Sequence, residues 1–432
     1  MIRSALFAAA TALLALACSA AAQDVAIINA NVAIGDGGDP IEGATVLVQR
    51  GKVVAAGRNI SIPADTPTLD GSGTWVTPGL VLAVTDLGLA DVGAVSQSND
   101  KAAAKSRFNA ALDIAPAINP ESLHIKVSRA AGLTRAVVVP SHGGSLFAGQ
   151  GAIIALGSDG KAVRHPRALQ LVALDEGGAQ ISGGGRAASF AELRNALREA
   201  RDYAAGRWSG EDNLLTRADA EALSPVASGK QKLFVEVERA SDIRAVLALK
   251  AEFAQIDMVL VGVSEGWLVA DEIAAAGVPV VADALDDLPS SFEQLGATQS
   301  NVGRMAKVGV KVAIGRFAGS TDGHPRSLAQ FAGNLVALTR VPGATGLSWG
   351  QALAAITSVP ADIAGHGGHF GVLSPGAHGD LVIWDGDPLE VSSAPMKVFI
   401  DGVEQSLENH QTRLRDRYRD LDESDLPKAY DH

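Results

Sequence analysis

The sequence contains a single cysteine, Cys18, among its 432 residues. Cys18 lies in an N-terminal stretch that we expect to be removed, so the mature chain excludes disulfide bonds and thiolate metal ligands. Basic residues are also few, because 36 Lys and Arg stand against 48 Asp and Glu and give a net charge of −12. Nucleic acids and anionic membranes are recognised by clustered Lys and Arg. The composition therefore argues against both as partners.

The sequence has no hydrophobic run long enough for a transmembrane span. The one clear apolar run, Ala5–Ala17 near the N-terminus, is too short. It follows the positively charged Arg3 and precedes small residues that end at Ala22. This order is typical of a secretory signal peptide over residues 1–22. The sequence predicts cleavage near Ala22 and a periplasmic or secreted protein.

Lipid attachment at Cys18 is the alternative for this segment. Ala15 stands where a lipoprotein signal usually has leucine. We therefore favour the cleaved, unlipidated form.

The remaining composition is that of a soluble α/β protein, with 47% hydrophobic residues, 19% charged residues and 47 glycines. The length suffices for one large domain and one small one.

Short strand-like segments separated by glycine turns occupy both ends of the mature chain. We expect residues 24–77 and 366–405 to build one small β-sandwich. The last residues, 406–432, are highly charged and predict a solvated helix followed by a loose tail without a chemical role.

Between these ends, residues 78–365 alternate apolar strand-like runs with helical patterns such as Phe190–Ala204 and Ala240–Phe253. This alternation predicts an α/β fold with a parallel (β/α)8 TIM-like barrel. Seven strands are expected at 80–86, 134–141, 169–176, 233–239, 258–265, 278–285 and 310–317, with an eighth near 151–157.

Three segments carry a resemblance to a known family. Residues 75–89, WVTPGLVLAVTDLGL, resemble the first barrel strand of the amidohydrolase superfamily, where Pro-Gly-Leu-Ile-Asp-x-His-x-His-Leu is expected. Residues 233–249, LFVEVERASDIRAVLAL, and 374–390, SPGAHGDLVIWDGDPLE, are similar to the imidazolonepropionase-like branch. The resemblance implies a barrel with a small β-sandwich, and hydrolysis of C–N bonds in amides, cyclic amides or dipeptides by a metal-activated water.

The metal ligands that the resemblance implies are replaced in this chain. The two histidines of the first strand fall on Val84 and Asp86, the third falls on Glu236, and the aspartate of the last strand falls on Arg316 or Phe317. Valine has no lone pair for a cation, and neither Arg316 nor Phe317 can act as a base or ligand. We therefore expect no metal at the usual positions Val84, Asp86, Glu236 and Phe317, and no cofactor.

Some oxygen and nitrogen donors remain from which a site could be rebuilt. Asp86, Glu236 and His324 are the residual ligands for zinc or another divalent metal, since carboxylates and imidazoles bind such ions. For Asp86 the competing interpretation is a polar residue at the barrel mouth bonded to loop amides.

Four residues are candidates for catalysis at the C-terminal ends of the strands, where barrels of this kind carry their active sites: Glu236, Glu238, His142 and Asp322. Glu236 and Glu238 face the same side of their strand by its period of two, and so could bind a hard cation or share a proton. An ion pair of these carboxylates with Arg239 or Arg316 is the competing interpretation.

The positions of the other histidines indicate surface or loop residues without a role in the site. His366 and His369 lie in the glycine-rich GHGGHFG segment, far in sequence from every strand end, and His124 and His165 are expected on the surface or in loops.

Three functions remain open. The chain is predicted to be a catalytically impaired homologue, a pseudoenzyme, that binds a small polar amide or peptide. The alternatives are an active amidohydrolase or peptidase with a reorganised carboxylate-rich site, and a structural subunit of the envelope. A homo-oligomer or association with an active relative is possible in each case.

Overall fold

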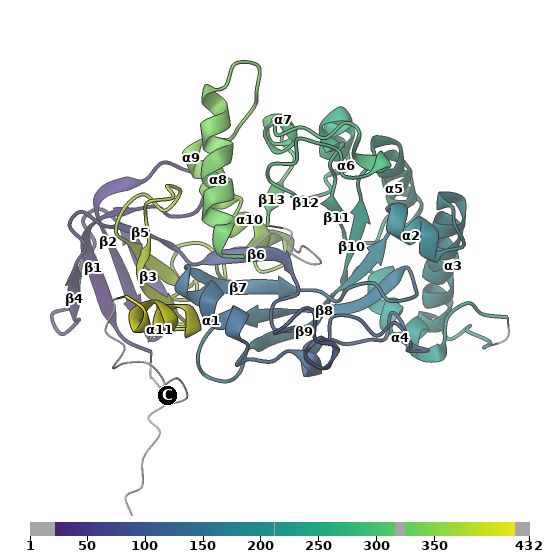
Figure 1. Ribbon diagram of the computed structural model, residues 1–432, viewed down its shortest axis with the longest axis horizontal. Helices are drawn as coiled ribbons and strands as arrows, with labels where there is room; N and C mark the ends of the chain where they lie inside the picture. Colours follow the sequence, from purple (N-terminus) through teal and green to yellow (C-terminus); the bar gives the residue numbers. More distant parts are fainter. Residues whose placement is uncertain (1–21, 211, 316–324, 420–432) are drawn as a thin grey trace, which may run out of the picture.

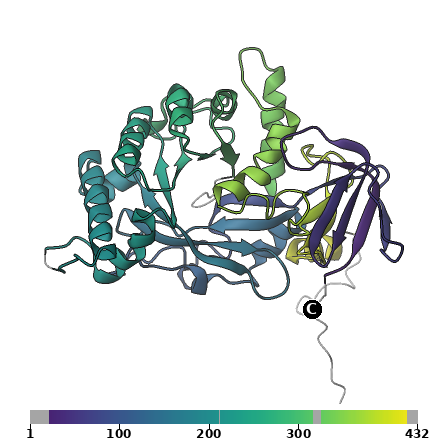
Figure 2. The ribbon, with the colours of Figure 1, turned by 180° about the vertical axis from the view of Figure 1, so that it is seen from behind.

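Figure 1 shows the computed structural model, which describes residues 22–210, 212–315 and 325–419. Two sheets dominate it. One lies beside the other, and the helices α2 to α8 surround the larger sheet (Figures 1 and 2). None of the helices in the described ranges is both long and apolar enough to cross a membrane.

The smaller sheet joins the two ends of the chain, as the sequence predicts. Its strand order is β16-β15-β14-β5-β1-β2-β3, with β4 paired to β1. The contact between the ends is made by β14 and β5, which run antiparallel, with Trp384 opposite Trp75 and Leu381 opposite Pro78. The strands are β1 Val25–Val32, β2 Ile41–Gln49, β3 Lys52–Gly57, β4 Thr68–Asp70, β5 Trp75–Pro78, β14 Leu381–Trp384, β15 Pro395–Ile400 and β16 Val403–Gln405.

The larger sheet is the expected eight-stranded barrel, in the order β13-β12-β11-β10-β9-β8-β7-β6. Its first and last strands meet where Val84 N donates to Gly315 O at 3.2 Å. The strands are β6 Leu80–Thr85, β7 Leu133–Val138, β8 Phe147–Ala155, β9 Val163–Ala173, β10 Lys232–Val237, β11 Met258–Gly262, β12 Val280–Ala282 and β13 Val312–Ile314.

The expectation of a wholly parallel barrel is wrong at one strand. β8 runs antiparallel to both β7 and β9. No helix separates β7, β8 and β9, and a parallel pair needs a long crossover whereas an antiparallel pair does not. The segment near 151–157 thus supplies the eighth strand, but in a meander.

The other strands are connected through helices. The two helices expected from the sequence are found as α3 and α5. The helices are α1 Leu123–Ala130, α2 Glu176–Ile181, α3 Arg186–Ala204, α4 Arg217–Ala227, α5 Ala240–Glu252, α6 Ala270–Ala276, α7 Asn301–Lys307, α8 Leu328–Ala337, α9 Trp349–Ala354, α10 Ser358–Ile363 and α11 His410–Arg417. The short α11 is the described part of the predicted charged tail.

The interior of the barrel is packed with apolar side chains. Val84, Leu171, Phe234, Val261 and Ala313 are all at most 2% exposed and belong to one cluster. Ala361, Ile363 and Phe370, which lie in α10 and the segment after it, join the same cluster. The return to the small sheet therefore contributes to the barrel core as well as to the sheet.

Candidate functional site

The C-terminal ends of the barrel strands bring several of the predicted residues together. Asp86 follows β6, His142 follows β7, Glu236 lies near the end of β10 and Glu238 directly follows it. In each case the buried apolar strand fixes the backbone, and the polar side chain comes where the strand ends. These four side chains therefore lie at one end of the barrel, which we call the mouth.

His142 and Glu236 form a hydrogen-bonded pair. His142 Nε2 lies 2.7 Å from Glu236 Oε2, and the two side chains are 16% and 10% exposed. Burial by itself lowers the pKa of His142, but the hydrogen bond and charge of Glu236 outweigh it and raise that pKa, with further help from Asp175 and the backbone of Ser145. The contact with Glu236 thus favours the charged form of the imidazole.

Among the described residues, the side chain of Asp86 is engaged by a cation. Lys101 Nζ lies 3.3 Å from Asp86 Oδ2, and both side chains are about one quarter exposed. Lys101 also ties two loops together, because its carbonyl oxygen accepts from Ser141 N at 2.7 Å. The loop that carries Lys101 therefore packs on the loop that carries His142.

Val84, which occupies the position of the family's first histidine, lies in the barrel interior. Val84 is fully buried among apolar side chains. The remaining candidates of the last strand and its loop, Arg316, Phe317, Asp322 and His324, lie outside the described residues.

Glu238 faces a different partner from Glu236. Its Oε2 accepts from Ser264 N at 2.9 Å and from Ser264 Oγ at 2.8 Å. The carboxylate lies over Gly262, where a Cβ atom would come within 2.2 Å of Glu238 Oε1. Gly262 also has a φ of +91°, so this position requires glycine for two reasons. Arg239, one of the expected partners, binds Asp242 at 2.8 Å instead.

Two further buried acids at this end of the barrel escaped the sequence analysis. Glu265, two residues past the Gly262–Val263 turn, accepts from Ala240 N and Gly296 N, both at 2.9 Å. Glu293 accepts from Glu176 N at 2.7 Å and from Arg186 Nη2 at 2.9 Å. Glu265 ends the apolar run 258–265 and could have been found by its strand-end position. Glu293 comes from a loop, and no pattern marks it.

Glu293 is a buried acid whose pKa is strongly raised. Burial, followed by the charge of Asp175, raises its pKa to about 7. Glu176 and Glu238 raise it further, while the hydrogen bond from Glu176 N lowers it. A carboxyl group that titrates near neutral pH is therefore present at the mouth.

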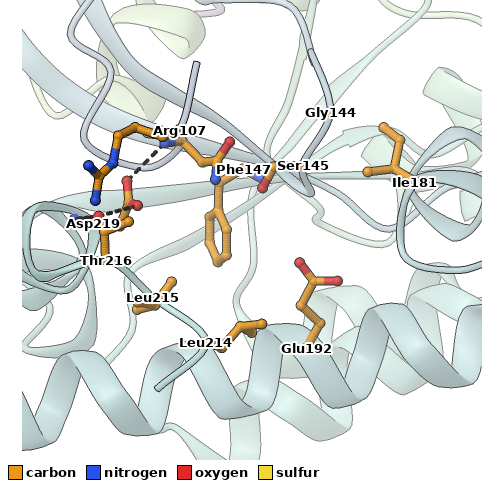
Figure 3. A pocket seen from close by; sticks show the side chains of 11 residues that line it. Arg107, Gly144, Ser145, Phe147, Ile181, Glu192, Leu214, Leu215, Thr216 and Asp219 are labelled. Atoms are coloured by element: carbon orange, nitrogen blue, oxygen red, sulfur yellow. Dashed lines mark hydrogen bonds between the residues drawn. The ribbon is translucent and has the colours of Figure 1, made fainter. Parts of the chain in front are cut away.

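A hollow of about 180 Å³ borders the loop after β7 (Figure 3). The Phe147 ring and the Glu192 carboxylate point into it, and Leu215 forms part of its wall. Asp219 also lines it, but its Oδ1 accepts from two backbone amides at 2.9 Å each. Asp219 is thus a structural anchor, and the lining of the hollow mixes apolar side chains with polar ones such as Arg107 and Thr216.

The donors present do not fit the metal site of the resemblance. One ligand position is apolar, and the two carboxylates at ligand positions are each bound to a cation of the chain. Within the described ranges, no three His, Asp or Glu side chains are grouped so that they could hold an ion. Asp86 and Glu236 would have to leave Lys101 and His142 before they could act as ligands.

The remaining histidines lie elsewhere. His124 Nε2 lies 2.9 Å from the carbonyl oxygen of Asp91, on the surface near α1. His165 and His366 lie against each other, with His369 beside His366. The contact of His165 with the return segment was not foreseen.

The barrel and its attached sheet are those of known hydrolases. An amidohydrolase from Thermotoga maritima MSB8 matches 88% of this chain and 99% of its own, with 24% identity and a TM-score of 0.77. Phenylurea hydrolase B matches 89% of the chain and 97% of its own, with 15% identity and a TM-score of 0.55. A prolidase in complex with N-methylphosphonate-L-proline matches 88% and 99%, with 16% identity and a TM-score of 0.51. These identities show the fold.

Sequence comparison agrees. Residues 231–404 match the sequence model described as Amidohydrolase family, Amidohydro_3. A stretch of 60 residues is 47% identical to amidohydrolase tasK of Hapsidospora irregularis, and this match spans 14% of the chain but only 6% of that protein. These matches make the chain similar to the amidohydrolases, in sequence over residues 231–404 and in fold over most of its length.

Proposed function

We propose that this chain is a catalytically impaired amidohydrolase homologue that binds a small polar amide or peptide at the mouth of its barrel. The observation that carries the proposal is the pairing of both carboxylates at ligand positions with cations of the same chain. Lys101 binds Asp86 at 3.3 Å, and His142 binds Glu236 at 2.7 Å. These cations take the place that a divalent ion would occupy in neutralising the carboxylates.

Electrostatics supports this proposal. A divalent ion at Asp86 and Glu236 would be repelled by the Lys101 ammonium, and by His142 whenever its imidazole is protonated, so that both side chains would have to move or lose a proton first. Val84 offers no donor to offset that cost.

The alternative of an active, metal-independent hydrolase requires a base to activate water. His142 is the imidazole nearest to Glu236, but its raised pKa favours the protonated form, which donates rather than accepts a proton. The pair is better suited to hold the carbonyl oxygen or carboxylate of a bound ligand by hydrogen bonds and charge. We therefore place binding ahead of turnover.

The hollow beside the His142 loop supports a small ligand. Its volume of about 180 Å³ and its mixed lining of apolar and polar side chains suit a small polar amide or peptide. Export through the predicted signal peptide, residues 1–22, remains part of the proposal, with the binding site then facing the periplasm or the medium.

The test is metal content of the untagged mature protein by elemental mass spectrometry after dialysis against zinc and manganese. The Asp86→Asn and Glu236→Gln variants, and a screen of dipeptides and cyclic amides for hydrolysis and for thermal stabilisation, accompany it. We expect thermal stabilisation by a ligand, no turnover, and a metal content that is the same in the variants and the wild type. A stoichiometric ion that is lost in both variants, together with hydrolysis, would overturn the proposal.

A further inference from the structure

Histidines gather at the end of the barrel opposite the mouth. The chain has nine histidines. His165 lies near the start of β9, and His366, His369 and His378 lie in the segment that returns from α10 to the small sheet. His378 is engaged by Asp401, at 2.5 Å. Of the other three, His165 and His366 are hydrogen-bonded to each other, so a metal ion between them would take the place of the shared proton.

His165 and His366 present two ring nitrogens to each other. His165 Nδ1 lies 3.2 Å from His366 Nε2, and the rings meet edge to face with centroids 5.4 Å apart and an interplanar angle of 79°. Two nitrogens bound to one tetrahedral zinc ion at about 2.0–2.1 Å each lie roughly 3.3–3.4 Å apart. The spacing in this chain is therefore close to that of two ligands of one ion.

The backbone and neighbouring rings hold His366 in place. His366 N donates to Ala361 O at 2.8 Å, and the carbonyl of His366 accepts from His369 N at 3.0 Å. The His366 ring stacks on Phe370, with centroids 5.4 Å apart and an angle of 24°. Phe370 is anchored in the barrel interior. A ligand held in this way loses little freedom when it binds an ion.

The cations nearby are already neutralised. Arg135 lies over the Phe370 ring and binds Asp380 and Asp401 at 2.6 Å each. Lys232, whose side chain lies beside Gly365, binds Asp257 at 2.7 Å. An incoming cation at His366 would not face an uncompensated charge from these residues.

We propose that His165 Nδ1 and His366 Nε2 form a binding site for a divalent transition-metal ion of the zinc, nickel or copper class. Neutral imidazoles select these ions over magnesium and calcium, which prefer oxygen ligands. Since no three donor side chains among the described residues surround one point, water fills the remaining positions. His369, with its ring centroid 6.1 Å from that of His366, is the third imidazole within reach of a side-chain rotation.

This site is separate from the mouth. β9 and β10 are parallel, with Ala173 opposite Glu236. His165 precedes Ala173 by eight residues on the same strand, which corresponds to roughly 26 Å at about 3.3 Å per residue. Metal at His165 and His366 therefore reports nothing about the mouth, and the two sites are tested independently.

The experiment is calorimetric titration of the untagged mature protein with zinc chloride, and with copper chloride as the second probe. The variants are His165→Asn and His366→Asn, and the matched control is His124→Asn, because the His124 imidazole lies on α1 and contacts a backbone carbonyl. We expect one saturable ion per wild-type chain, an affinity at least on the order of 10-fold weaker in either variant, and no change in the control.

The Glu236→Gln variant tests whether the mouth contributes to metal binding. We expect it to bind zinc as tightly as the wild type does. Absence of saturable binding would overturn the proposal, as would equal affinity in the wild type and His165→Asn, or a loss of affinity in Glu236→Gln. His165 is exposed, so its variant remains informative if His366→Asn fails to fold.

Discussion

The two ends of the barrel use the same kinds of charged residue in different ways. At the end opposite the mouth, which we call the closed end, Arg135 is 3% exposed. Its guanidinium binds both Asp380 and Asp401, so that strand β7 of the barrel is tied to the small sheet. At the mouth, Lys101 and His142 each bind one carboxylate and stay partly accessible.

The two ends of the barrel differ in how completely the charged groups are hydrogen-bonded. Asp380 Oδ1 accepts from Asp401 N as well as from Arg135, and the charge of Arg135 together with the hydrogen bond from His378 holds the pKa of Asp401 well below its usual range despite burial. A fully satisfied buried network resists change, because removing one partner leaves a buried charge. The pairs at the mouth are partly exposed, so a ligand can reach them.

The largest effect is expected from Arg135→Met at the closed end. Asp380 would then be a buried carboxylate without its cation, and we expect a loss of about 3–5 kcal/mol in the free energy of unfolding. Urea denaturation at pH 7 measures it. Arg164→Met is the control, since Arg164 makes exposed pairs with Asp159 and Asp401 and should cost less than about 1 kcal/mol. Equal losses in the two variants would contradict the difference between saturated and exposed pairs.

Glu293→Gln should have the next largest effect, and it should be stabilising. The pKa of Glu293 in the folded protein, about 7, lies above that of an unfolded glutamate, so the folded state binds the proton more tightly. Wild-type stability should therefore fall as the pH rises from about 4.5 to about 7, and the variant should lack this loss. At pH 8 we expect the variant to be more stable by about 1–3 kcal/mol.

Denaturation curves of both proteins between pH 5 and pH 8 test this prediction. A variant that is less stable than the wild type at pH 8 would show that the contact with Arg186 outweighs the burial of the charge.

Glu236→Gln should change the ionisation of His142 more than the total stability. Without the Glu236 charge, burial dominates and the pKa of His142 should fall below its wild-type value. The raised pKa stabilises the folded wild type below the unfolded histidine pKa of about 6.5, and this contribution is lost as the pH rises through the folded value. The variant should lose that dependence.

Titration of the imidazole by NMR follows the change directly. Glu238→Gln is the matched control, because its carboxylate binds Ser264 and should move the His142 pKa less. Equal shifts in both variants would mean that the mouth acts on His142 as a whole rather than through one pair.

The smallest effect is expected from Lys101→Met. The pair with Asp86 is about one quarter exposed, and such pairs contribute less than about 1 kcal/mol. Thermal denaturation should thus give nearly the wild-type midpoint. A loss as large as that of Arg135→Met would place Lys101 in a structural network.

Much of the fold was predictable because each strand is an apolar run bounded by polar turns. Leu80–Thr85, Lys232–Val237 and Met258–Gly262 lie within a residue or a few of the expected segments. The direction of Phe147–Ala155 was not predictable, because an apolar run has the same composition whichever way it points. Strand direction follows from the connections, and here the loops on both sides of β8 lack the helix that a crossover needs.

The candidate site divides in the same way. Asp86 and Glu236 were identified because the family resemblance places metal ligands there, and Glu238 because it faces the same side of its strand as Glu236. Their partners were not, because Lys101 and Glu293 come from loops whose paths no periodicity describes. The pairing of His142 with Glu236 joins residues 94 positions apart.

The sequence by itself determined the barrel with its attached sheet, the composition of the strands and the loss of the histidine pattern in the first strand. These features are local, since they depend on which side chains follow one another along a strand. Only the tertiary structure decided that Lys101 neutralises Asp86, that His142 binds Glu236, and that His165 meets His366. Each of these contacts joins distant segments, and the energy of a charge or a hydrogen bond depends on distance and burial, which exist only once the chain is folded.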